Sequence, residues 1–308
     1  GDENAILELF KLVFKNEIDF NYWNWRYQSN PAGNHFIRLM WEGDVLIGHY
    51  AVSPVKMNFF GKEDMAALSM TTMTHPDHSG KGILNKLALN LYEELETKHG
   101  FKGIWGFPNK NSHCLLIKNL GWTDVGVIHN LTMPININTY RQSEKIKGSK
   151  NFSGKHEKKL KELSSSFNMN VIKDVKYLNW RYTLNPSQDY TVFNYADGDQ
   201  EGFVVTKIYP SNIQSGAYDL YLMELGLKKD QLGLLKTFLD HIMHHYNVNF
   251  DRVHIWLNLW DQRHIILEKM GFFPEGRSTF FGIRNSTGNE NVANLKNWSY
   301  SFGDSDIY

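Results

Sequence analysis

The chain has 308 residues, of which 42% are hydrophobic and 21% are charged, so its composition is that of a globular protein and excludes a largely disordered chain. Its 33 basic residues equal its 33 acidic residues, which argues against a nucleic-acid binder that works by counterion release. The single cysteine, Cys114, can form neither an internal disulfide nor a structural zinc site. The length suits two domains of ordinary size.

The first half alternates helical and strand patterns, each read from the spacing of its apolar residues. In chain order we expect a helix at 4–14, strands at 45–52, 55–60 and 66–74, an amphipathic helix from 83 to 99, a strand at 103–107, a short helix at 112–120 and a last strand at 125–133. Ser53 and Pro54 interrupt the first two strands. Glycines end both later helices. This order predicts an α/β layer fold with a mixed, mostly antiparallel sheet.

The second half repeats the first. Tyr-x-Asn-Trp-Arg-Tyr-x-x-Asn-Pro occurs at Tyr22–Pro31 and again at Tyr177–Pro186, and agreement that includes Trp and Pro is hard to obtain by chance. The predicted elements recur as strands at 192–195, 202–209 and 217–225, a helix at 232–246, a strand at 253–257, a helix at 264–270 and a strand at 280–284. We therefore expect two domains, 1–137 and 166–308, joined by a solvated linker at 138–165, with an aromatic-rich tail docked on the second.

Two glycines lie between the strand that ends at Thr74 and the helix that begins at Ile83. The first amides of a helix lack intrahelical partners, and the helix dipole adds positive potential there, so a glycine turn before a helix suits an anion. Gly80 and Gly82 would let the backbone approach a phosphate closely, and His78 and Lys81 could add positive charge. Gly-x-Gly alone is equally typical of a plain tight turn.

Wider sequence context favours the phosphate interpretation. Thr71–Ile83, which reads Thr-Thr-Met-Thr-His-Pro-Asp-His-Ser-Gly-Lys-Gly-Ile, resembles motif A of the GNAT N-acyltransferase superfamily, with His78 where Arg or Gln is usual. Phe107–Ser112 and Leu120–Trp122 resemble motif B of the same superfamily. The resemblance covers nearly the whole chain as a tandem pair. It implies two GNAT domains and acyl-coenzyme A as co-substrate, without a metal.

The resemblance also implies roles for single residues. The amides of Met73 and His75 would bind the pantetheine arm, the loop from Ser79 to Ile83 would bind the pyrophosphate, and a splay between two neighbouring strands would hold the thioester. The full set expected to bind the co-substrate is Met73, Thr74, His75, His78, Ser79, Gly80, Lys81, Gly82, Ile83, Asn109 and Asn111.

The second copy has lost most of the loop. Lys229–Leu234 aligns with His78–Ile83, and only Gly233 remains, while Leu232 stands where Lys81 does. A bulky Leu at the phosphate contact should not cradle a pyrophosphate. We expect one acyl-CoA per chain, held by the first half, with the second half shaping the acceptor site.

The catalytic residues are less well defined by the sequence. The family's usual acid, a Tyr, is replaced by Ile117, which leaves Asn109, Ser112, His113 or solvent to protonate the leaving thiolate. His49, His113 and His129 are candidates for a base near neutral pH, and we favour His113 because its loop should face the thioester. Cys114 could act as a nucleophile, but its apolar neighbours favour a buried structural thiol.

The acceptor can be approached only by resemblance. The repeated motif, Gly-Phe-Pro-Asn-Lys-Asn-Ser and the terminal Gly-Asp-Ser-Asp-Ile-Tyr look like a bacterial subgroup that N-acylates nucleotide-linked amino sugars such as dTDP-3-amino-3,6-dideoxyhexoses, with acetyl or 3-hydroxybutanoyl groups, for surface polysaccharides. The candidates for contacts with this substrate are His49, His129, Trp180, Asp304 and Asp306. The Trp-Arg-Tyr that both copies keep is itself expected to be structural.

Two other functions stay open. One is a tandem-GNAT peptidyl or aminoacyl transferase that uses aminoacyl-tRNA, which the retained glycine loop and the neutral charge disfavour. The other is a non-catalytic sensor of acyl-CoA, which stays possible because Ile117 replaces the family's usual Tyr. The chain has no run of about 20 apolar residues and no signal-peptide pattern, so we expect a cytoplasmic protein without nucleic-acid or membrane partners. A homodimer stays open.

Overall fold

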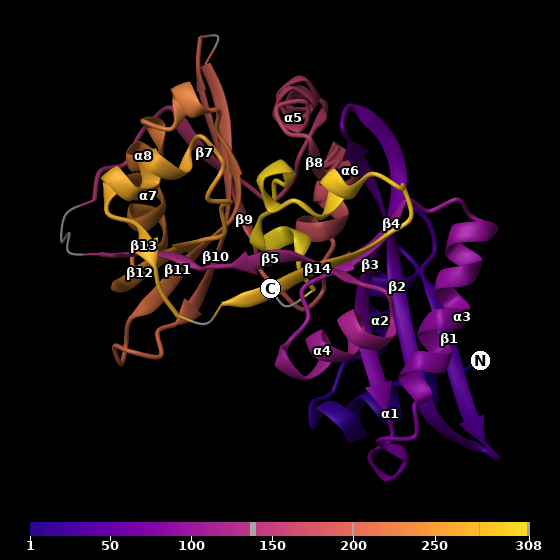
Figure 1. The fold of residues 1–308 in the computed structure, drawn as a ribbon. Helices are drawn as coiled ribbons and strands as arrows, with labels where there is room; N and C mark the ends of the chain where they lie inside the picture. The colour runs from indigo at the N-terminus through magenta and orange to yellow at the C-terminus, as the bar shows by residue number, and fades with distance from the viewer. Residues whose placement is uncertain (136–139, 199, 277, 307–308) are drawn as a thin grey trace. The chain divides into compact units, whose positions relative to one another are not determined.

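A computed structural model describes residues 1–135, 140–198, 200–276 and 278–306 (Figure 1). The expected boundary at residues 137 and 138, and Ile307 and Tyr308 of the terminal motif, lie outside the described residues. The chain forms two compact units that are not contiguous in sequence. Unit 1 comprises Gly1–Gly126, Leu184–Ser187 and Phe280–Asn294, and unit 2 comprises Val127–Thr183, Gln188–Thr279 and Leu295–Tyr308.

The sheet of unit 1 has the strand order β1-β2-β3-β4-β14-β5. Its strands are β1 (Phe36–Glu42), β2 (Val45–Phe59), β3 (Lys62–Thr74), β4 (Gly103–Gly106), β14 (Thr279–Asn285) and β5 (Thr123–Ile128). β3 and β4 run parallel, whereas β1–β2, β2–β3 and β4–β14 are antiparallel. The mixed sheet flanked by helices confirms the predicted α/β class.

Alternation along β2 gives the sheet of unit 1 two apolar faces. Tyr50 and Val52 pack with α3 (Ile83–Thr97), while Ala51 packs with α1 (Glu3–Phe14) and α2 (Phe20–Tyr27). α4 (Lys110–Asn119) follows β4 and buries Leu116 in the α3 face. The helices predicted for this half are all present.

The sheet of unit 2 has the order β13-β6-β12-β11-β10-β9-β7. Its strands are β13 (Phe273–Pro274), β6 (Leu131–Pro134), β12 (Phe250–Ile255), β11 (Tyr218–Gly226), β10 (Gln200–Pro210), β9 (Thr191–Asp197) and β7 (Ile146–Ser149). α7 (Leu234–Tyr246) and α8 (His264–Met270) pack on it, and Leu235, Phe238 and Ile242 of α7 are fully buried. The parallel pair β11–β12 corresponds to β3–β4 of unit 1.

Each sheet contains a strand from the far part of the chain. β14, drawn in yellow in Figure 1, lies between β4 and β5, although the sequence places it near the C-terminus. β6 lies in the sheet of unit 2, although it follows β5 directly. The single strand predicted at 125–133 was wrong, because His129 and Asn130 separate two strands that belong to different sheets.

Two further expectations differ from the structure. β2 is continuous through Pro54, which lies beyond the last β1–β2 pair, Phe36–Val52, so its missing N–H costs no bond to β1. Residues 138–165, expected as a solvated linker with part of a helix, contain that helix as α5 (Glu157–Ser164), but they also contain β7, and α5 buries Leu160. β8 (Met169–Val171) and α6 (Val175–Leu178) follow. In the described part of the chain, no helix has the length and hydropathy to cross a membrane.

Candidate functional site

The glycine loop of unit 1 leads from β3 to α3 through a short turn. His75 N–H donates to the carbonyl of Ile47 on β2, which fixes the end of the strand, and Pro76–His78 form one turn of 3-10 helix. Gly80 and Gly82 then take φ values of 78° and 71°, in the left-handed region that favours glycine. A Cβ built on either glycine would meet no atom within 4 Å, so the loop faces open space.

The start of α3 has the features of an anion site. Gly82 is its N-cap residue and has no side chain to cap it, so the first-turn amides that begin at Ile83 lack a side-chain partner. The helix is held against the sheet at this end, because a Cβ on Gly48 of β2 would lie only 2.4 Å from Ile83 Cγ2. The glycine at position 48 therefore permits the close approach that fixes where the loop amides point.

The charged side chains around the loop partly compensate one another. Lys81 Nζ lies 3.2 Å from His78 Nδ1, and His78 Nε2 lies 3.6 Å from the carboxylate of Glu42. His75 Nδ1 accepts from the amide of Asp77 at 3.3 Å. Lys81 is exposed and is the permanent cation of this loop. The backbone is thus the main anion-binding element, with Lys81 as a solvent-facing addition.

β3 and β4 stop pairing before β3 reaches the glycine loop. They pair only at Ala67–Ile104 and Leu68–Trp105. β4 then ends at Gly106, whereas β3 continues as far as Thr74. The wedge between them is the splay that the sequence analysis expected to hold a thioester.

β3 also contains a β-bulge that its residue types did not predict. Its register with β2 shifts between the pairs Met73–His49 and Met70–Ala51. Within the bulge Thr71 takes a φ of 40°, which is unusual for a β-branched residue. His49 Nδ1 lies 2.9 Å from the Thr71 carbonyl oxygen, which can only accept, so Nδ1 donates.

Comparison with known proteins bears first on the N-terminal part of the chain. Residues 1–123 match the family model described as Acetyltransferase (GNAT) domain. This part of the chain is therefore similar to a GNAT domain. No curated protein matches the sequence.

The GNAT fold extends over nearly the whole chain. A GCN5-related N-acetyltransferase from Anabaena variabilis has a TM-score of 0.71 and 12% identity, covering 93% of this chain and 71% of that one. A conserved protein of unknown function from Enterococcus faecalis has a TM-score of 0.67 and 14% identity, covering 92% and 70%. The N-myristoyltransferase of Saccharomyces cerevisiae with bound myristoyl-CoA has a TM-score of 0.61 and 12% identity, covering 96% and 81%. At these identities the likeness concerns the fold.

The catalytic candidates of unit 1 gather at the start of α4. Asn109 is its N-cap residue, and its Oδ1 accepts from the amides of Asn111 and Ser112. Ser112 Oγ also turns back to Asn109. His113 Nε2 lies 2.5 Å from Asp124, and its ring stacks on Phe280 at 4.0 Å between centroids. The structure thus brings the predicted trio together, with His113 already partnered on one nitrogen.

His49, expected as a substrate contact and possible base, is buried inside unit 1. Burial lowers its pKa to about 4, so it is neutral near pH 7. Its Nε2 is buried and has no partner among the described residues. The Nδ1 bond to Thr71 fixes its tautomer, which suits a residue that holds the bulge in place.

The remaining substrate candidates lie in unit 2. His129 is exposed, and its Nδ1 bonds Ser278. Trp180 is buried and packs against Tyr177. Asp304 is buried in an ion pair with Lys173, and Asp306 is exposed. No group of three or more His, Cys, Asp or Glu in the described residues has the arrangement of a metal site.

Cys114 and Ile117 both lie on α4. Cys114 was expected to be buried, and this was wrong, because it is exposed on α4. Successive helical positions turn by about 100°, so the apolar run Cys114–Ile117 cannot all face the core, and Leu116 is the member that does. Ile117, at the position of the family's Tyr, packs partly against the same core.

The matching loop of unit 2 is shorter and has lost the left-handed turn. Its 3-10 turn, Lys229–Gln231, is followed by only Leu232 and Gly233 before α7 begins. Leu232 is fully buried in the core, and Gly233 takes a helical φ of −56°. A Cβ built on Gly233 would also meet no atom within 4 Å, so this loop differs from Ser79–Gly82 in its backbone conformation and in its buried Leu232.

Proposed function

We propose that the protein is an acyl-CoA-dependent N-acyltransferase whose GNAT domain binds one acyl-CoA per chain. The observation that carries the proposal is the coincidence, in unit 1 alone, of an open left-handed glycine loop, an uncapped helix N-terminus and a splayed strand pair. A pyrophosphate needs clustered backbone N–H donors, and the loop and helix N-terminus supply them beside the unpaired end of β3.

The residues of unit 1 fit the parts of such a ligand. The loop amides from Ser79 to Ile83 would bind its pyrophosphate, and Lys81 would add a cation. The backbone of β3 from Met73 to His75 would bind its amide-containing arm, and Asn109 would lie beside that arm. The ligand would supply an acyl group activated as a thioester.

The reaction we propose is direct transfer. The acceptor's neutral amine nitrogen bonds to the acyl carbon, the carbon–sulfur bond breaks, and the amine proton leaves to a base while the thiolate is protonated. Positioning both partners in the splay accounts for a large part of the rate enhancement. His113, Asn109 and Ser112 lie nearest in sequence to the splay, and they remain our candidates for the proton transfers.

The acceptor we propose is the amine of a nucleotide-linked amino sugar, with the second unit shaping its site. This rests on the resemblance of the repeated and terminal motifs. An acyl-CoA co-substrate is consistent with a cytoplasmic location. The test is release of free thiol from acetyl-CoA and 3-hydroxybutanoyl-CoA in the presence of a panel of amino sugars, nucleotide-linked and free. Turnover on simple amines or peptides alone would reject the sugar assignment.

A non-catalytic sensor is the second candidate, because Ile117 stands where the family commonly has its acid. The two functions separate in one experiment. A sensor would bind acetyl-CoA in calorimetry yet release no thiol with any amine in the panel, whereas an enzyme would do both.

A further inference from the structure

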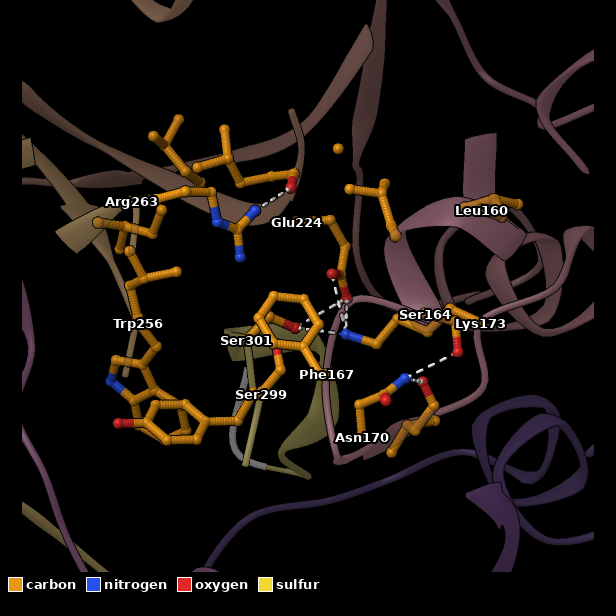
Figure 2. A pocket seen from close by; sticks show the side chains of 18 of the residues that line it. Leu160, Ser164, Phe167, Asn170, Lys173, Glu224, Trp256, Arg263, Ser299 and Ser301 are labelled. Carbon is orange, nitrogen blue, oxygen red and sulfur yellow. Dashed lines mark hydrogen bonds and ion pairs between the residues drawn. The ribbon is translucent and has the colours of Figure 1, made fainter. Parts of the chain in front are cut away.

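Unit 2 contains a pocket at the point where its two parallel strands part (Figure 2). The pairing of β11 with β12 ends at Leu222–Ile255. The pocket begins just beyond, lined by Glu224 and Gly226 on one strand and by Trp256 after the other. It is therefore the counterpart of the expected thioester splay of unit 1, kept in a copy whose loop has lost its left-handed glycines.

The pocket is small and mostly apolar. Its volume is about 80 Å³. Since a cavity needs roughly 10–15 Å³ to hold one water molecule, there is room for a group of several non-hydrogen atoms. Six of the apolar side chains around it are Leu163, Phe167, Phe203, Leu222, Trp256 and Leu257. A small apolar pocket with a few convergent polar groups is the usual form of a binding site.

One polar wall is the carboxylate of Glu224. Its Oε1 accepts from Lys173, Tyr182 and Ser301, each at 2.8 Å, and its Oε2 accepts from Lys173 at 2.9 Å. Lys173 also pairs with Asp304. Lys173 is thus shared between two buried carboxyl groups. Among the described residues Oε2 has only this one donor, so it retains the capacity to accept a second hydrogen bond.

The other polar wall is the guanidinium of Arg263, whose Cζ lies 5.5 Å from the centre of the Phe167 ring (Figure 2). Its charge is compensated by Asp261, which Nε and Nη2 both contact. Nη1 donates to the carbonyls of Leu225 and Leu227. A guanidinium has five N–H groups, so within the described part of the chain one N–H of Nη2 has no acceptor.

These two walls specify the chemistry of a ligand. Lys173 is shared by Glu224 and Asp304, so an anionic ligand would meet buried negative charge, while a cationic ligand would offer no acceptor to Arg263. What remains is one donor on Arg263 and one acceptor position on Glu224, beside an apolar wall. A group with one acceptor, one donor and a short apolar part satisfies all three.

We propose that this pocket binds a small uncharged amide, such as the acetamido group of an N-acylated amine. Its carbonyl oxygen accepts from Arg263 Nη2, its N–H donates to Glu224 Oε2, and its methyl group packs on the apolar wall. This site is separate from the acyl-CoA loop, and its occupancy does not depend on acyl transfer.

The test uses the wild-type chain and probes of matched size: acetamide, N-methylacetamide, acetate and methylammonium. Binding is followed by titration in ¹H–¹⁵N correlation spectra, at the backbone amides of Leu225, Gly226 and Leu257. The proposal predicts saturable shifts for both amides, with a Kd on the order of millimolar for ligands of this size. It predicts at least tenfold weaker effects for acetate and methylammonium.

A variant of a pocket residue tests whether the amides bind in the pocket. Ser299→Leu adds bulk to the wall, while Ser165→Leu is the control on an exposed neighbouring position that does not line it. We expect Ser299→Leu to abolish the amide shifts and Ser165→Leu to preserve them. If Ser299→Leu fails to fold, the wild-type probe series still decides.

Three results would overturn the proposal: no saturable shift with either amide, tighter binding of acetate or methylammonium, or unchanged amide binding in folded Ser299→Leu. A loss of acetyl-CoA binding or of thiol release would leave this test unaffected, because the shifts are measured without co-substrate. The failure of this site and the failure of the proposed enzyme activity are therefore distinguishable.

Discussion

His49 Nδ1 donates a hydrogen bond of 2.9 Å to the carbonyl oxygen of Thr71, the residue whose left-handed φ of 40° forms the bulge in β3. A positive φ at a β-branched residue costs on the order of 1–3 kcal/mol and persists where neighbouring structure enforces it. The bulge lies two residues before Met73, where the proposed ligand-binding backbone begins. We infer that His49 holds that backbone in position.

This relationship predicts energetic coupling between the two residues. His49→Leu should lower the free energy of unfolding by about 1–3 kcal/mol, because it leaves a buried carbonyl without its donor. Thr71→Gly removes the conformational strain, so His49→Leu should cost less in that background. A double-mutant cycle by urea denaturation measures the coupling. Additive effects within error would show that His49 does not enforce the bulge.

The glycines of the two loops should respond differently to the same substitution. Gly80→Ala places a Cβ on a left-handed residue and should lower the free energy of unfolding by about 1 kcal/mol. It should also weaken the binding of acyl-CoA. Gly233→Ala, at the matching loop of unit 2, has a helical φ and should be neutral or stabilising by about 0.4–1 kcal/mol. Thermal denaturation and calorimetry with acetyl-CoA measure both. Equal loss of affinity in the two variants contradicts the assignment of the loop to unit 1.

Stability should fall as the pH is lowered from about 6.5 to 4. Burial lowers the pKa of both His49 and His254 from 6.5 to about 4. In that interval the unfolded chain binds a proton at each imidazole that the folded chain does not, so the free energy of unfolding decreases with falling pH and levels off below the folded pKa. For His49, the more deeply buried, the full effect is about 3 kcal/mol. Urea denaturation between pH 4 and 7.5 should give a flatter profile for His49→Gln, and identical profiles would refute the assignment.

The buried ion pair of unit 2 should matter far more than an exposed one. Burial opposes the charge of Lys173, but Asp304 and Glu224 beside it raise its pKa. Lys173→Met leaves two buried carboxyl groups without their cation and should cost about 3–5 kcal/mol. Lys145→Met, which removes an exposed partner of Asp197, should have little effect on stability. Chemical denaturation compares the two, and equal costs would contradict a structural role for the buried pair.

Local periodicity predicted most elements of both units, including α3, α7 and α8, because burial of one helix face leaves its pattern in the sequence. The exchange of β6 and β14 could not be predicted in this way. The apolar stretch from Thr123 to Pro134 looks continuous, and which sheet a strand joins depends on residues distant in the chain.

In the candidate site, too, some features could be predicted from the sequence and others could not. Gly80 and Gly82 marked the loop, because only glycine readily takes the φ values found there. Nothing marked the bulge, since a β-branched Thr71 argues against a positive φ. The partners of His113 could not be predicted from the sequence either, because Asp124 and Phe280 come from β5 and β14.

The central claim is that one acyl-CoA binds per chain, at the glycine loop of the first unit. Isothermal titration of the wild-type protein with acetyl-CoA tests it most directly, with Gly80→Glu as the variant that puts bulk and a negative charge in front of the loop. We predict a stoichiometry of one and the loss of binding in the folded variant. A stoichiometry of two, or an unchanged affinity in Gly80→Glu, would contradict the claim.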